Sequence, residues 1–253
     1  MPFTPTHALA AVPLSRVGGT LPSALAIGCV LPDLPMFIPG APSYATTHSL
    51  VLGVPSCLPY GILAFVLFRL CRGPALGFAP LVMRRRLGHY AAADLRLTPA
   101  LVGALFVSIA LGVLSHIVWD SFTHAHRLGS ELVPVLSVPW VEVGGYAIPG
   151  YRLLQHGSSV VGLPLLVMIV VRWYRRQPLD AAPAAAAAPR ALSWLALSLI
   201  VAVPLLAGAI AYFRAMHAPH HFLTAMAYHA VTMTIGGYVV VAVLVTLPQR
   251  VLK

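Results

Sequence analysis

The chain has 253 residues, of which 59% are hydrophobic and 9% are charged, and its formal net charge at pH 7 is +10. A soluble domain carries about 25% charged residues, so this composition excludes an ordinary soluble protein and predicts an integral membrane protein. The basic excess is almost entirely arginine and gathers in a few loops. That distribution is typical of topology signals and of contacts with anionic lipid, and it argues against nucleic-acid binding.

Apolar stretches along the chain predict an all-α fold, a polytopic transmembrane helix bundle. Five full spans are expected, at about 50–70, 99–122, 158–174, 192–213 and 223–247. An earlier apolar segment, 21–39, is interrupted by prolines and by Asp33. It is expected to form either a sixth span or, with the residues from 3 onwards, a hairpin of short helices that turns at Gly18-Gly19.

The composition also predicts a division of the chain into a core, a linker and a C-terminal hairpin. Residues 177–190 are rich in alanine and proline, which is typical of a linker. They would join a transmembrane core of residues 1–176 to a transmembrane hairpin of residues 191–253. Basic stretches at 72–97, 175–190 and 250–253 predict the cytoplasmic side, so the alternate loops, including 124–157, are expected to face outwards.

Two of the six acidic residues, Asp33 and Asp120, lie inside apolar segments. Asp120 is the centre of a His116-x3-Asp120-x3-His124 pattern. On a helix these three positions fall within about 80° of arc, so their side chains project from one face. An ionisable group inside a membrane span costs at least a few kcal/mol unless it is paired, hydrated or bound to a metal, so this face is a candidate functional site.

Other histidines are expected at the same outer depth as Asp120. Under the predicted topology, His48 and His156 lie beside the outer ends of their spans, and further histidines lie around the last outer turn, at 217, 220, 221 and 229. Imidazole and carboxylate together are the ligands of zinc and related divalent ions, so the sequence predicts a metal site at this face. The simpler alternatives are a hydrogen-bonded His116–Asp120 pair and, for the last group, an interfacial histidine cluster.

Five short motifs carry a resemblance to a known family. They are Pro2–Ala8, Gly28–Asp33, Thr47–Ser49, Leu114–His124 and Leu154–Ser159. In this order, over about residues 1–173, they resemble the motifs of a bacterial inner-membrane family known as domain of unknown function 4184. A looser resemblance is to membrane-bound proteins classed as metal-dependent hydrolases, and a still looser one is to the zinc-dependent phospholipase C group.

The resemblance implies a ligand set and a location. It makes Asp33, His48, His116 and Asp120 one metal site. His7 would add a second ion bridged by Asp120, and His124 or His126 with His156 would complete a third. The soluble enzymes have a glutamate where this chain has Val160. One or two divalent ions, zinc or a related metal, are therefore expected, in a protein of the bacterial inner membrane.

The resulting functional hypothesis is a membrane-bound metal-dependent hydrolase. It would act on a phosphoester or lipid-like envelope substrate at the outer face, with membrane lipids as partners and no nucleic acid. Asp33, His116 and Asp120 are the predicted catalytic residues, because they would hold a metal that activates water. Two alternatives stay open: a transporter or channel that uses the cluster for protons or metal ions, and a non-catalytic protein with a structural metal.

Overall fold

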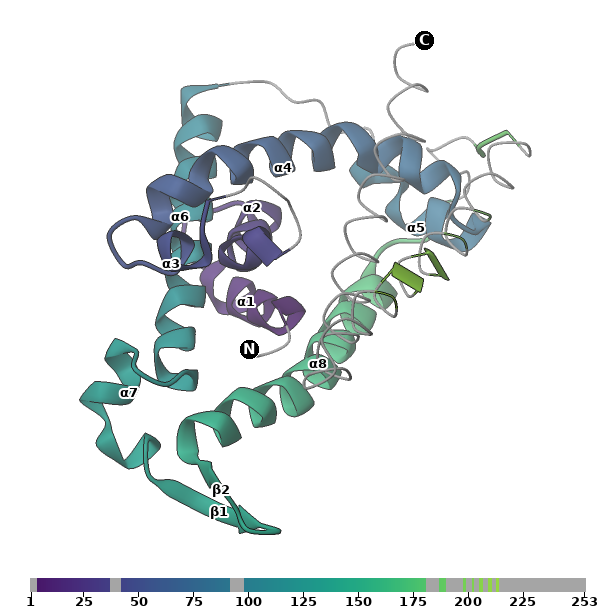
Figure 1. Ribbon diagram of the computed structural model, residues 1–253. Coiled ribbons are helices and arrows are strands. Elements are labelled where there is room, and N and C mark those ends of the chain that lie inside the picture. Colours follow the sequence, from purple (N-terminus) through teal and green to yellow (C-terminus); the bar gives the residue numbers. More distant parts are fainter. Residues whose placement is uncertain are drawn as a thin grey trace. The chain divides into compact units, whose positions relative to one another are not determined.

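The computed structural model describes residues 4–36, 42–91, 98–180 and 187–189, with scattered positions between 198 and 213 (Figure 1). This part of the chain is mostly helical, with one antiparallel pair of strands. With 3-10 helices written η, the elements are η1 (Thr4–Ala10), α1 (Ala11–Leu14), α2 (Pro22–Gly28), η2 (Leu31–Met36), α3 (Tyr44–Thr47), α4 (Gly53–Gly77), α5 (Leu81–Ala91), α6 (Pro99–Thr123), α7 (Leu128–Leu132), η3 (Pro134–Leu136), β1 (Pro139–Val143), β2 (Tyr146–Pro149) and α8 (Gly150–Arg176).

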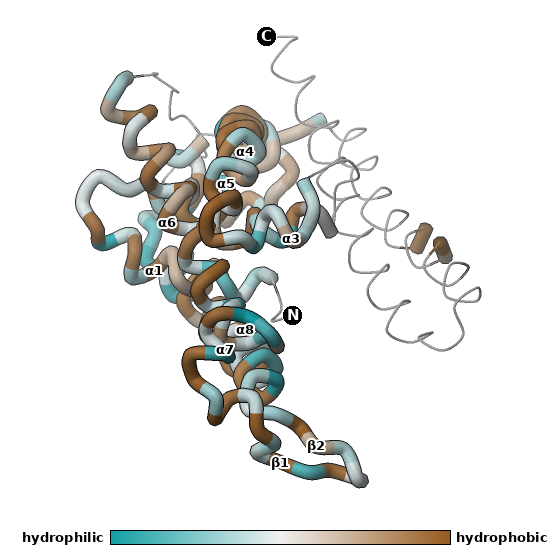
Figure 2. Tube along the Cα trace, turned by 60° about the vertical axis from the view of Figure 1, so that its left-hand side comes forward, coloured by the Kyte–Doolittle hydropathy of each residue, from teal (hydrophilic) through white to brown (hydrophobic). Residues whose placement is uncertain are grey.

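Within the described residues, three helices are long and apolar enough to cross a membrane: α4, α6 and α8. Figure 2 shows long apolar stretches on these helices in brown. Many of their large apolar side chains are exposed, as at Val160 and Val161 of α8. Long helices with apolar side chains on their outer faces indicate a membrane protein.

The three helices confirm the spans expected at 50–70, 99–122 and 158–174, with different ends. Helix α8 begins eight residues before its expected start, at Gly150 rather than Ser158. Polar residues such as Arg152 and Gln155 lower the hydropathy of that first part, although they are compatible with a helix. The spans expected at 192–213 and 223–247 lie outside the described ranges, so the structure supports three of the five.

The sequence allowed a sixth span or a hairpin of short helices for the N-terminal segment, and the structure shows the hairpin. Helices η1 and α1 run into a turn that contains Gly19, whose φ is +78°, and α2 then leads back to η2. Each of these helices is at most seven residues long, so none could cross a bilayer. Pro22 sits in the first turn of α2, where its missing N–H costs nothing.

Helix α2 packs on α6 at a point where both backbones approach closely. A Cβ atom on Gly112 of α6 would lie 2.5 Å from the carbonyl oxygen of Leu25. A Cβ on Gly28 of α2 would lie 2.5 Å from the carbonyl oxygen of Ile109. Small residues at such a crossing let two helices meet without a side chain between them. The contact holds Cys29, which follows α2, against the half of α6 that carries His116.

The connection between α6 and α8 contains a β-hairpin that the all-α prediction missed. Strands β1 and β2 pair antiparallel, with Val143 opposite Tyr146. The two turn residues, Gly144 and Gly145, have φ values of +57° and +81°. Positive φ at both positions is the type I′ geometry that joins two strands tightly and favours glycine. The fold is therefore mostly α with one short β-hairpin.

The described residues divide into two compact units. The first lies within 1–35, 40–65 and 96–176 and contains every residue of the site described below. In the second, the side chains of Arg85 and Arg86 donate hydrogen bonds to the carbonyl oxygens of Asp180 and Gln177, at 2.6 and 2.8 Å. These bonds tie α5 to the chain that follows α8. The core, linker and hairpin boundaries predicted from composition stay a prediction.

The glycine contact leads to a first prediction. Gly112→Ala should destabilise the protein by about 1–3 kcal/mol, because the added methyl group meets backbone that cannot rotate away. Thermal unfolding of the purified protein in detergent measures the effect. Gly103→Ala, on the same helix, is the control: a Cβ there meets no atom within 4 Å. It should leave the unfolding temperature unchanged or slightly higher, since alanine favours a helix. Equal effects of the two substitutions would contradict the packing described.

Candidate metal centre

Four buried side chains converge on one point of the first unit. Asp33, His48, His116 and Asp120 each offer one ligand atom, and these atoms all lie within 4.8 Å of one another. Asp33 comes from η2, His48 directly follows α3, and His116 and Asp120 lie one turn apart on α6. The structure thus brings together residues from three separate segments, the same four that the family resemblance implied.

The distances within the group match the spacing of metal ligands. His48 Nε2 lies 3.5 Å from Asp33 Oδ1 and 3.4 Å from Asp120 Oδ2. His116 Nε2 lies 3.7 Å from Asp33 Oδ1 and 3.5 Å from Asp120 Oδ2. These separations are long for hydrogen bonds. Atoms bound at about 2.0–2.1 Å to a zinc ion lie about 3.3–3.4 Å from each other, which is close to the four His–Asp separations, although the four atoms as a set lie within 4.8 Å of one another.

All four ligand atoms lack a hydrogen-bond partner although they are buried: Asp33 Oδ1, His48 Nε2, His116 Nε2 and Asp120 Oδ2. A buried polar atom without a partner costs roughly 1–3 kcal/mol, and more if it is charged. Two carboxylates in one dry site also repel each other. A divalent cation at the centre would satisfy the four atoms and offset both negative charges, so the residues present fit a metal ion.

Hydrogen bonds to the backbone orient both histidines for this role. His116 Nδ1 donates to the carbonyl oxygen of Cys29 at 2.7 Å, and His48 Nδ1 donates to that of Tyr44 at 3.1 Å. A proton held on Nδ1 leaves the lone pair of Nε2 directed into the site. Metal-binding histidines are characteristically fixed in this way by a carbonyl or carboxylate group behind the ring.

Asp33 has an equivalent support. The hydroxyl group of Thr4 donates a hydrogen bond of 2.6 Å to Asp33 Oδ2, which leaves Oδ1 facing the histidines. Burial opposes ionisation of Asp33, but His48, His116 and Thr4 outweigh it and hold the pKa of this carboxyl below its ordinary value. Asp33 is therefore an anion at neutral pH, as a metal ligand must be.

His7 extends the group on its far side. Its Nε2 lies 3.5 Å from Asp120 Oδ1, and both atoms are buried without a hydrogen-bond partner. The ring stacks on that of His116, with centroids 3.8 Å apart. Burial, together with the charge of His116, lowers the pKa of His7 to about 4, so its imidazole is neutral at neutral pH. Asp120 thus presents one oxygen to the four-residue group and the other to His7, which suits a second ion bridged by Asp120.

His124 lies at the edge of the centre but its ring is engaged elsewhere. Its Nδ1 lies 3.1 Å from the carbonyl oxygen of Asp120, to which it donates, and 3.7 Å from Asp120 Oδ2. Its Nε2 accepts a hydrogen bond of 3.2 Å from the amide of Gln155. Both ring nitrogens of His124 are engaged in this tautomer, so its ring steadies the end of α6.

The structure does not bring the remaining predicted histidines to the centre. His156 is exposed on α8, and the buried side chain next to it is that of Gln155. His126 is also exposed and has a φ of +55°. The later histidines, at 217, 220, 221 and 229, lie outside the described residues.

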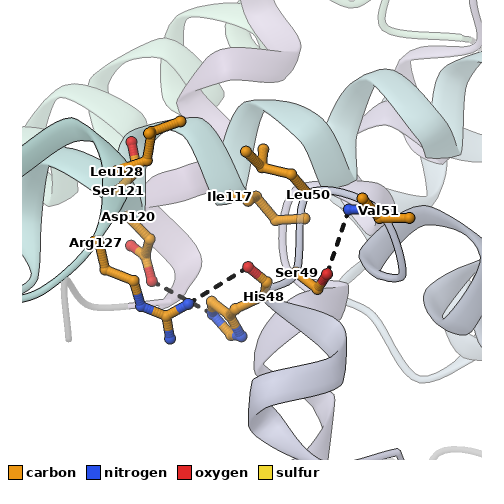
Figure 3. Close-up of a pocket in the computed structure, with 9 residues that line it drawn as sticks. All are labelled: His48, Ser49, Leu50, Val51, Ile117, Asp120, Ser121, Arg127 and Leu128. Atoms are coloured by element: carbon orange, nitrogen blue, oxygen red, sulfur yellow. Dashed lines mark hydrogen bonds and ion pairs between the residues drawn. The ribbon is translucent and has the colours of Figure 1, made fainter. Parts of the chain in front are cut away.

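A pocket of about 300 Å³ opens onto the centre (Figure 3). Two ligands, His48 and Asp120, form part of its wall, and Arg127 lies beside them. The other lining residues are Ser49, Leu50, Val51, Ile117, Ser121 and Leu128. A second cavity, of about 270 Å³, includes His7 in its lining. Cavities therefore lie against residues of the centre on two sides.

Sequence reasoning missed three residues that the geometry places at the site. Thr4 lies in the Pro2–Ala8 motif, but nothing in the sequence around it indicates a hydrogen bond to Asp33. Gln155 stood next to the more conspicuous His156. Arg127 directly follows His126, one of the predicted ligands, and this position was the only feature of the sequence that pointed to Arg127.

Comparison with known proteins places the chain in a family without assigning a function. A family model described as domain of unknown function (DUF4184) matches residues 1–247, so the chain belongs to that family. The match extends past residue 173, where the quoted motifs end. No curated protein and no solved structure matches the chain.

The ligand geometry predicts the metal content of variants. Protein purified after exposure to Zn²⁺ should hold one or two ions per chain, and Asp120→Asn should lose them, because this carboxylate touches both parts of the centre. Elemental analysis after gel filtration measures the ratio. His156→Ala is the matched control and should keep the wild-type content. A wild-type protein without stoichiometric metal, or an Asp120→Asn variant that keeps it all, would contradict the site.

A further prediction concerns the support of Asp33. Thr4→Val keeps the shape of the side chain but removes the hydroxyl group, so it should weaken metal binding by about 10–100-fold. Thr4→Ser keeps the hydroxyl group and should restore most of the affinity. Competition with a chelator of known affinity gives both values. Unchanged affinity in Thr4→Val would show that this hydrogen bond does not orient the ligand.

Proposed function

We propose that this member of the DUF4184 family is a membrane-bound metal-dependent hydrolase that acts on a phosphoester bond of a lipid-like substrate. The observation that carries the proposal is the set of buried, partnerless ligand atoms next to a pocket that two of the same residues line. A divalent ion held there would activate water and draw electron density from a phosphoryl oxygen. The alternative of a hydrogen-bonded His116–Asp120 pair is disfavoured, because His116 Nε2 and both Asp120 oxygens lack such bonds.

The roles of the side chains follow from where they lie. Asp33 and His116 would hold the ion from the fully buried side, and His48 and Asp120 from the side of the pocket. Asp120 would also bridge to a second ion held with His7. In the reaction, the oxygen of water bonds to phosphorus, the ester P–O bond breaks, and a proton from water ends on the departing alcohol oxygen.

The depth of the centre supports a substrate drawn from the membrane. Asp120 lies three residues before the end of α6 at Thr123, and His48 lies five residues before α4 begins. Both are thus near the ends of helices long enough to cross a membrane, where lipid headgroups lie. The loop charges favour the outer face of a bacterial inner membrane for this end.

The transporter alternative receives less support from α6. Its ionisable residues, His116 and Asp120, both lie in the last third of the helix, and the buried polar residue of the first half is Ser108. A proton or ion path across the membrane needs polar groups on both sides of the midplane. Nothing along α6 continues the cluster in that direction.

A structural metal is the second candidate, because four buried protein atoms could close a site without room for water. It predicts that metal removal lowers the unfolding temperature and that no substrate is turned over. The pocket wall formed by His48 and Asp120 favours the hydrolase over this candidate.

Turnover separates the two candidates. Zinc-loaded protein in mixed micelles with phosphatidic acid or phosphatidylglycerol should release phosphate or a phosphorylated alcohol, measured by phosphorus NMR. Asp120→Asn should lower the rate by at least roughly a hundredfold, since the change removes a ligand outright. His156→Ala should match the wild type. A metal-loaded wild type that turns over neither lipid, and loses stability on chelation, would favour the structural role.

A further inference from the structure

Arg127 lies in the wall of the pocket beside the metal ligands. Figure 3 shows its guanidinium group next to His48 and Asp120. The side chain is half-buried, and it forms no salt bridge with a carboxylate of the described residues. Arginine near a buried acidic cluster would ordinarily pair with it. Here the carboxylates face the histidines, and the guanidinium group is left facing the pocket.

The position of Arg127 is fixed on several sides. Its backbone N–H donates to the hydroxyl group of Ser130 at 3.2 Å, at the start of α7. The guanidinium carbon lies 5.7 Å from the centre of the Tyr44 ring, within range of a cation–π contact. Its Nη1 lies 3.5 Å from the carbonyl oxygen of His48. These contacts hold the cation at the pocket while leaving most of its N–H groups available to a ligand.

The charges at the pocket favour an anion. Two neutral imidazoles, two carboxylates and one divalent ion sum to zero, so Arg127 makes the filled centre positive. A planar guanidinium group binds two oxygens of a phosphate at once, which a lysine cannot do in the same geometry. A phosphate between Arg127 and the centre would touch both positive groups.

The rest of the pocket is apolar and partly open. Leu50, Val51 and Leu128 line it, with 51%, 80% and 51% of their surfaces exposed. Exposed apolar residues at the mouth of a charged pocket suit a ligand with a polar head and an apolar remainder.

We propose that Arg127 is the anion-binding residue of this pocket, and that it selects the phosphate group of an amphiphile. The inference rests on the proposed function, because it places the phosphate beside the metal ligands. It assigns Arg127 to substrate recognition. Metal binding is left to Asp33, His48, His116, Asp120 and His7.

The experiment measures ligand binding and metal content separately on the full chain in detergent. Inorganic phosphate and phosphatidic acid are titrated into zinc-loaded wild type, Arg127→Gln and Arg127→Lys, by calorimetry. Arg127→Gln should keep its zinc and bind both ligands roughly ten- to a hundredfold more weakly. Arg127→Lys should fall between the two. Arg152→Gln is the control, because Arg152 is exposed on α8 and does not line the pocket.

The outcomes are distinct from those that test the hydrolase. Unchanged phosphate binding in Arg127→Gln, or loss of zinc from this variant, would overturn the assignment. If phosphatidic acid bound no more tightly than inorganic phosphate, the claim that the pocket selects an amphiphile would be wrong. If the wild type held no zinc, the proposed function would fail. Phosphate binding by the metal-free protein that depends on Arg127 would still support the anion site. If the metal-free protein bound no phosphate through Arg127, the anion site would fail as well.

Discussion

Two carboxylates buried in one apolar environment are the constraint on which the site depends. Asp33 and Asp120 share His48 and His116 as neighbours, at distances too long for good hydrogen bonds. In a low-dielectric interior such a pair is strongly unfavourable unless a cation sits between the two charges. No arginine or lysine side chain forms a salt bridge with either carboxylate in the described structure. The side chains are placed as they would be around a metal ion.

Backbone contacts of the fold position the ligands next to one another. The α2–α6 contact brings backbone against backbone at Gly28 and Gly112. It thereby sets the carbonyl oxygen of Cys29 where it can hold the ring of His116. The 3-10 helix η2, which follows α2, then brings Asp33 to the same point.

The sequence was most informative where an ionisable residue stands in an otherwise apolar segment. Asp120 and His116 stood out because charge is rare in an apolar helix, and helical periodicity then placed them on one face. The hairpin of residues 4–36 could not be chosen over a span from hydropathy alone, since both have the same composition. The hydrogen bonds of Thr4 and the rotation of α8 that buries Gln155 and exposes His156 depend on three-dimensional packing. The sequence of α8 could not show which of these two residues is buried, because polar and apolar residues are not clearly separated between its faces.

The centre differs between its two sides, and this difference bears on its chemistry. Asp33 and His116 are fully buried, whereas His48 and Asp120 line one cavity and His7 lines another. A metal that serves only to join helices gains nothing from open cavities beside its ligands, since water there weakens the electrostatic attraction. An ion that must receive a substrate needs rigid ligands behind it and access in front. The arrangement here has both, with orienting hydrogen bonds on the closed side and an arginine on the open one.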